Sequence, residues 1–181
     1  MMFVTVGTHE ASFERLLKTV DILRERRDIK DPVFIQTGHT AYTPVHCGYR
    51  MFLPFSVMNS LFQRARVVVT HGGDCVMLVL KHGKVPIVVP RLKRYGEHLD
   101  DHQLEFTRHM SELGLVMPCI EMEDLPDALR RWERGFAGGV AGMVRENARR
   151  FAELMEQMSG TLVGCPGILQ GTVDNTPLER G

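Results

Sequence analysis

The sequence predicts an α/β fold, an open and mostly parallel sheet with helices on both faces. Short β-branched runs typical of buried strands alternate with amphipathic stretches typical of helices. In the clearest case, the run at residues 67–70 is followed by a helical pattern that stops at Gly83 and then by a second apolar run at residues 85–89. A strand–helix–strand unit of this kind makes its two strands parallel neighbours.

The first elements follow in chain order. Residues 3–6 are predicted to form a buried strand, and Thr8 can cap a helix that reaches about Arg27. Residues 33–36 form the second predicted strand, which Gly38 ends, and residues 49–55 are predicted to be extended. Ser56 can cap a short helix that leads into the strand at residues 67–70.

The later elements begin with a polar loop that leads into a predicted helix at residues 101–113, which Gly114 ends. Residues 115–117 are predicted to form the last strand, and residues 123–132 and 141–158 are predicted to form amphipathic helices. After Gly160 neither a helical nor a strand pattern continues. We therefore predict one domain over residues 1–160 and a loose tail over residues 161–181.

The composition excludes some classes of partner. The 181 residues hold 22 basic and 22 acidic side chains, so nothing indicates binding to nucleic acid or to an anionic membrane surface. The four cysteines form no CxxC pair, and the first residues are too short for a signal peptide. We therefore expect free thiols in a cytoplasmic protein.

Two glycine turns are candidate ligand sites, because ligands of such sheets bind beyond the carboxyl ends of the strands. The first is His71-Gly72-Gly73, which follows the strand at residues 67–70, and the second is Gly7-Thr8. Glycines let the backbone approach a ligand closely, and free N–H groups at the start of a helix favour an anion such as phosphate. The alternative is that these glycines only make tight turns.

The polar loop and the helix start that follows it form a third candidate. Carboxylates accept hydrogen bonds from sugar hydroxyls, and glutamine both donates and accepts. Those properties indicate hydroxyl recognition by Glu97, Asp101, His102 and Gln103, although the same residues also suit an ordinary acidic helix start. Together with the glycine turns, they suggest a nucleotide-sugar site.

Other chemistries find less support. No nucleophile elbow, phosphate-binding GxxxxGK[ST] loop or GxGxxG turn is present in the sequence. His98 and His102 have a spacing used by metal ligands, and Asp100 or Asp101 could complete a metal site. A metal-dependent hydrolase is therefore an alternative, but no HExxH-type pattern supports it.

Several stretches resemble the C-terminal domain of family 28 glycosyltransferases, over about residues 3–115. They are most similar to the small subunits of bacterial exopolysaccharide glycosyltransferases, the PssE-like group. That group is related to the small subunit of the eukaryotic enzyme that adds the second N-acetylglucosamine to dolichol-linked sugar. The matching stretches are FVTVGTH at residues 3–9, VTHGG at 69–73, GKVPIVVPR at 83–91 and GEHLDDHQ at 96–103.

The resemblance implies the Rossmann-like donor half of a GT-B glycosyltransferase. It implies a UDP-sugar donor, inversion at the anomeric carbon, and no cofactor or bound metal. The acceptor would be a lipid-diphosphate-linked sugar, and a membrane-anchored partner subunit would supply the acceptor-binding half and the general base. The chain would then be cytoplasmic and peripheral to the inner face of the cell membrane.

The resemblance also assigns roles to the candidate residues. It implies that Gly7 and Thr8 lie near the donor or the cleft, and that the turn at residues 71–73 meets the diphosphate. Asp101, His102 and Gln103 would meet the sugar. On this basis Gly72→Val is expected to abolish donor binding and to leave the fold intact.

The sequence departs from the family pattern directly after Gly73. The family has a small residue and a serine there, and often a glutamate for the ribose further on. This chain has Asp74-Cys75-Val76, a stretch to Gly83 that is one residue shorter, and Leu78 near the glutamate position. An aspartate beside a diphosphate repels it unless it turns away. The alternative function is therefore a non-catalytic module that stabilises a partner and has lost donor binding.

Overall fold

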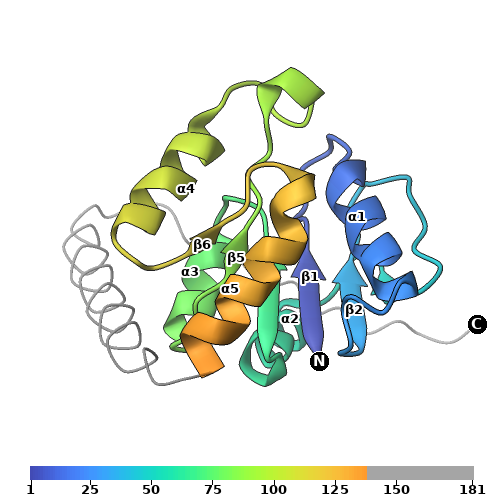
Figure 1. Ribbon diagram of the computed structural model, residues 1–181. Helices are drawn as coiled ribbons and strands as arrows, with labels where there is room; N and C mark the ends of the chain where they lie inside the picture. Colours follow the sequence, from blue (N-terminus) through green and yellow to red (C-terminus); the bar gives the residue numbers. More distant parts are fainter. Residues whose placement is uncertain (138–181) are drawn as a thin grey trace, which may run out of the picture.

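The computed structural model describes residues 1–137, and at its centre is a sheet of six strands in the order β3-β2-β1-β4-β5-β6. Every pairing is parallel, so the predicted α/β class is confirmed (Figure 1). The strands are β1 (Met2–Thr5), β2 (Val33–Gln36), β3 (Gly48–Arg50), β4 (Val67–Thr70), β5 (Ile87–Val88) and β6 (Met117–Pro118). The helices are α1 (Glu14–Glu25), α2 (Phe55–Arg64), α3 (Cys75–Lys81), α4 (His102–Glu112) and α5 (Leu125–Ala137), with short 3-10 turns η1 (Lys93–Tyr95) and η2 (Met122–Asp124).

β1 is the central strand of this order. Val4 pairs with Ile35 of β2 on one side and with Val69 of β4 on the other. All four residues of β1 and all four of β4 are buried, as the β-branched and apolar runs predict for strands covered on both faces. The chain winds outward from β1 in both directions, so the strand order reverses between β1 and β4.

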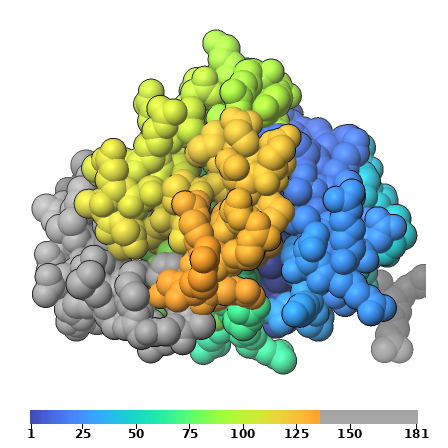
Figure 2. Space-filling view, in the orientation of Figure 1, coloured from blue at the N-terminus to red at the C-terminus, as the bar shows by residue number. Residues whose placement is uncertain are grey.

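Helices cover both faces of the sheet. On one face, α1 and α5 pack over the strands, where Leu17 and Leu125 join a core with Val4 and Val69 (Figures 1 and 2). On the other face, α2 and α3 enclose Phe3 and Val68. α4 packs beside α3 in a smaller cluster over β5.

Lys84 holds the end of α2 in place. Its Nζ donates hydrogen bonds of 2.5 to 2.8 Å to the carbonyls of Phe62, Gln63 and Ala65. These carbonyls belong to the last turn of α2 or follow it, where a helix leaves acceptors unpaired. A side chain from the segment before β5 therefore ties α2 to the sheet.

The first helix, α1, begins later than predicted. It starts at Glu14 and not directly after Thr8. The residue directly before the helix, Phe13, is held by a distant part of the chain. The N–H of Phe13 donates to Oγ1 of Thr40 at 3.0 Å, and Thr8 is exposed in the preceding loop. The capping role predicted for Thr8 is therefore wrong.

Smaller differences concern the ends of other elements. α2 begins at Phe55 after Pro54, so Ser56 does not cap it. Of the extended stretch predicted at residues 49–55, only residues 49–50 lie in a strand, β3. The helix predicted at residues 141–158, the domain end at residue 160 and the tail at 161–181 lie outside the described residues.

Cys47, Cys75 and Cys119 are free thiols, as predicted, and Cys165 lies outside the described residues. Within residues 1–137, every helix is too short or too polar to cross a bilayer.

Candidate functional site

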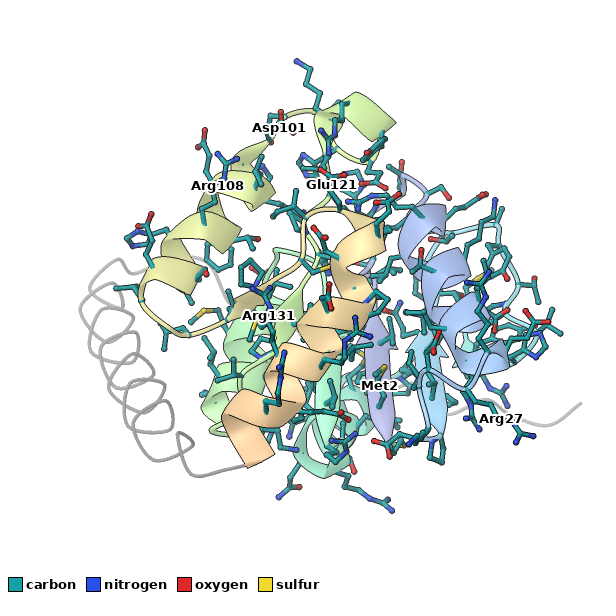
Figure 3. All side chains as sticks on the ribbon, viewed as in Figure 1. Met2, Arg27, Asp101, Arg108, Glu121 and Arg131 are labelled. Atoms are coloured by element: carbon teal, nitrogen blue, oxygen red, sulfur yellow. The ribbon has the colours of Figure 1, made fainter. Side chains whose placement is uncertain are left out.

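The two predicted glycine turns meet at the point where the strand order reverses. Gly7 follows β1, and the turn at residues 71–73 follows β4, so both lie at the carboxyl edge of neighbouring strands. In Figure 3 this edge is at the upper end of the molecule, where Asp101 and Glu121 are labelled, far from Met2 at the start of β1. Open parallel sheets bind their ligands at such a point.

The ring of His71 joins the two turns. A Cβ at Gly7 would lie 2.6 Å from Cε1 of His71, and a Cβ at Gly73 would lie even closer to Nε2. Gly7 also has a φ of +74°, which L side chains rarely adopt. The glycines of both turns therefore make room for an imidazole that lies between them.

His71 is 9% exposed, and its surroundings keep it neutral. Burial, and after it the nearby charge of Arg91, lowers the pKa of His71 to about 4. Nδ1 of the ring lies 3.5 Å from Oγ1 of Thr70. At neutral pH the imidazole can therefore offer a hydrogen bond to a ligand, but not a positive charge.

Gly72 is in close contact with the start of α4. A Cβ there would lie 2.9 Å from the carbonyl oxygen of Gln103 and 3.0 Å from Oγ1 of Thr107. Any larger residue must push a helix backbone away from the turn. The expectation that Gly72→Val leaves the fold intact is therefore wrong.

Gln103 links α4 to the loop after β5. Its side chain is buried, and Oε1 accepts a hydrogen bond of 3.1 Å from the N–H of Arg91. Within residues 1–137, Nε2 of Gln103 donates to no protein group. The amide nitrogen therefore remains available to a ligand at this edge.

Arg91 is a residue of this edge that the sequence analysis missed. Its side chain is fully buried, and its guanidinium donates to the carbonyls of Val6 at 3.0 Å and Ala11 at 2.8 Å. It also lies 4.7 Å from the ring centroid of Phe13. Burial lowers the pKa of Arg91 to about 10, so the group remains charged at neutral pH and binds the loop after β1 to the loop after β5.

Glu97 supports the same loop from the inside. It is buried, and its Oε1 pairs with Nε of Arg15 at 2.8 Å, while Oε2 accepts from the N–H of Leu92 at 3.0 Å. The guanidinium of Arg91 also donates to the backbone carbonyl of Glu97, at 3.3 Å, and that of Arg15 donates to the carbonyl of Pro90. Arg15, Arg91 and Glu97 therefore hold the loop after β5 against the start of α1.

A hollow of about 560 Å³ opens beside Glu97. Its walls come from the first half of α1, from Tyr95 in η1, and from the segment around Glu121. Of the predicted site residues, Glu97 lines this hollow. The space is large enough for part of a small ligand, but none of the residues of the glycine turns lines it.

Asp101 and His102 lie at the exposed start of α4. Oδ1 of Asp101 accepts a hydrogen bond of 2.9 Å from the N–H of Lys93, and Nδ1 of His102 contacts Oδ1 of Asp100. Thr8 is exposed in the loop after β1. The structure therefore brings Gly7, His71, Gly72, Gly73 and Gln103 into one cluster and leaves Thr8, Asp101 and His102 open to solvent.

The stretch after Gly73 that departs from the family pattern lies at the start of α3 and within it. Asp74 is exposed before α3, a helix of 7 residues. Leu78, near the expected glutamate position, packs against the apolar cluster around Phe3 and Phe62. An apolar contact thus stands where a ribose-binding carboxylate was expected.

The family model described as "Glycosyltransferase family 28 C-terminal domain" matches residues 1–158. No curated protein sequence matches the chain.

Three solved structures share the fold. The glycotransferase of kitacinnamycin is 18% identical with a TM-score of 0.65, and the match covers 90% of this chain and 42% of that one. The glycosyltransferase SnogD from Streptomyces nogalater is 19% identical with a TM-score of 0.57, and the coverage is again 90% and 42%. MurG from Acinetobacter baumannii is 18% identical with a TM-score of 0.51, and the match covers 83% of this chain and 44% of that one. The chain thus spans less than half the length of these proteins.

Proposed function

Because the chain belongs to the glycosyltransferase family 28 C-terminal domain family, we propose that it is the donor-binding subunit of a glycosyltransferase that uses a UDP-sugar. The observation that carries this proposal is that the two glycine turns meet at the carboxyl edge of β1 and β4. There, two glycine turns close around His71 at the reversal of the strand order, and Gln103 packs against them. This is the place and the chemistry that a nucleotide diphosphate requires in an open α/β sheet.

The proposed donor lies along this edge. The backbone of Gly73, which is half-buried beside the His71 ring, meets the diphosphate. The amide nitrogen of Gln103 donates to a sugar hydroxyl, and the exposed Asp101 and His102 complete the sugar contacts. No metal or other cofactor is needed for this binding.

A partner subunit completes the proposed enzyme. This proposal rests on the resemblance of about residues 3–115 to the small subunits of bacterial exopolysaccharide glycosyltransferases. The partner is proposed to be membrane-anchored, to bind a lipid-diphosphate-linked acceptor and to supply the general base. Together the two subunits invert the anomeric carbon at the cytoplasmic face of the cell membrane, in the synthesis of a surface polysaccharide.

A second candidate function is a non-catalytic module that stabilises such a partner. The exposed Asp74 at the turn, and the apolar Leu78 where a carboxylate is expected, favour it. Both features weaken the contacts available to a UDP moiety. The two functions differ in one property, which is donor binding.

Calorimetric titration with UDP separates the two functions, with GDP as the control nucleotide and with a chelator present. The first function predicts binding of UDP at roughly micromolar affinity and weaker binding of GDP. Absence of UDP binding, both for the chain alone and with its partner present, would support the non-catalytic module.

The Gln103→Ala variant tests the proposed sugar contact. Loss of one hydrogen bond to a hydroxyl is expected to weaken UDP-sugar binding by about tenfold and to change UDP binding much less. Gln63→Ala, at an exposed position of α2, is the matched control. Equal losses for UDP and UDP-sugar would contradict the role. A thermal melt shows whether the variant keeps its fold without the bond to Arg91.

A further inference from the structure

A cluster of metal-ligand side chains lies at the start of α4. His98, Asp100 and His102 each offer one ligand atom, and these atoms lie within 4.8 Å of one another. We propose that this cluster binds one first-row divalent cation, with Zn²⁺ as the best fit. The site is distinct from the glycine turns and its existence does not rest on the proposed donor role, although it shares His102 with the proposed sugar contacts.

The geometry of the three side chains supports a shared ligand. Nδ1 of His98 lies 3.3 Å from Oδ1 of Asp100, and Nδ1 of His102 contacts the same oxygen. The ring centroids of His98 and His102 are 4.5 Å apart. Two imidazole nitrogens and one carboxylate oxygen therefore already converge, so an ion can be held with small rotations of exposed side chains.

A second observation concerns His98 itself. Its side chain is only 15% exposed, and its Nδ1 is a buried polar atom without a hydrogen-bond partner among residues 1–137. The nearby Asp100 oxygen is within ion-pair distance but does not have hydrogen-bond geometry. A buried polar atom that lacks a partner costs free energy, and a bound cation removes that cost.

The ring of His98 is also held in position by its neighbours. His9, from the loop after β1, lies against it with ring centroids 4.8 Å apart, and His102 lies against its edge. Nδ1 of His9 accepts a hydrogen bond from the N–H of Ala11, which fixes the orientation of the His9 ring. A ligand that is oriented in advance binds a metal more tightly.

The donor set selects the class of cation. Two imidazoles and a carboxylate are ligands of zinc sites with three protein ligands, in which water takes the fourth position. Nickel and copper accept the same ligands, whereas magnesium and calcium prefer oxygen donors. The site is therefore expected to bind Zn²⁺ and to discriminate strongly against Mg²⁺.

Zinc titration of tag-free, chelator-treated protein tests the proposal. Calorimetry is expected to show Zn²⁺ binding at roughly micromolar affinity. His98→Ala is expected to weaken this binding at least about tenfold. The matched control is His109→Ala, which removes an exposed histidine of the same helix outside the cluster and is expected to leave the affinity unchanged.

A second, spectroscopic measurement distinguishes loss of the metal site from loss of the fold in the variant. Co²⁺ bound in place of Zn²⁺ is expected to give visible absorption bands that His98→Ala loses, while a thermal melt shows that the variant is folded. The proposal is overturned if Zn²⁺ does not bind, if His98→Ala binds it as tightly as the wild type, or if Mg²⁺ binds with equal affinity. UDP titrations with chelator present are unaffected by these outcomes, so the two proposals can fail separately.

Discussion

At the residue scale, His71 shows how packing sets the charge state of a group at the carboxyl edge. Its ring lies between Gly7 and Gly73. The charged guanidinium of Arg91 is close enough to lower the pKa of this ring. A proton on this ring would bring two buried cations close together. The site therefore keeps one permanent cation, Arg91, and one neutral hydrogen-bonding ring, His71, side by side.

The pH dependence of stability follows from this charge state. The pKa of His71 is 6.5 in an unperturbed chain and about 4 in the folded protein, so between these values the folded state binds fewer protons than the unfolded state. The free energy of unfolding is therefore greatest above pH 6.5 and falls as the pH approaches 4, by about 3 kcal/mol at most from this group.

His71→Gln is expected to flatten that fall, which urea unfolding at several pH values measures. His109→Gln, at an exposed position of α4, should keep the wild-type slope. Parallel curves for the wild type and His71→Gln would show that another group is responsible.

Gly72 makes a second prediction at this scale. In Gly72→Ala, the new Cβ would meet the Gln103 carbonyl at 2.9 Å, so α4 must move away from the turn. We expect a loss of about 1–3 kcal/mol in the free energy of unfolding. Gly135→Ala is the matched control, because no atom lies within 4 Å of that added Cβ and alanine favours the helix by about 1 kcal/mol. Equal unfolding midpoints for the two variants would contradict the close contact at Gly72.

At the scale of elements, α2 depends on a side chain that lies outside it. Lys84 donates to three carbonyls at the end of α2, and burial lowers the pKa of its ammonium group. Lys84→Met keeps the apolar stem and removes the donors. We expect a loss of about 1–3 kcal/mol in the free energy of unfolding, measured with urea. Lys30→Met, at an exposed position, should change it by less than about 0.5 kcal/mol.

The sequence predicted these elements where the signal is local. The β-branched run of β4 and the glycines that end α3 and α4 are visible within a few residues, and all were found. The start of α1 was missed, because the oxygen that accepts the N–H of Phe13, the residue before the helix, belongs to Thr40, 27 residues away. A search for caps within the helix sequence does not detect such a partner.

The candidate site shows the same division between local and distant causes. The glycine turns could be predicted, because their position after buried strands is part of the local pattern. The reason for Gly72 could not, since α4 contacts it from 31 residues further along the chain. Arg91 was missed because an arginine after Pro90 has the appearance of a surface residue, whereas the fold buries it completely.

At the scale of the whole molecule, the sheet places all of its candidate chemistry at one end. Because every strand runs in the same direction, the loops after β1, β4 and β5 share an edge, and Arg91, Gln103 and Glu97 bind these loops to one another. The site is therefore a property of the parallel order rather than of any single motif.

The central position of β1 has a consequence for the synthesis of the protein. Met2 pairs with Val33 and with Val67, so during synthesis β1 waits for a second partner that is encoded much later. At about 5–20 residues per second, that wait is about 3–13 s. During it, an apolar strand has an unpaired edge, which is a template for aggregation. The yield of native protein is therefore expected to depend on what shields β1 until β4 has been made.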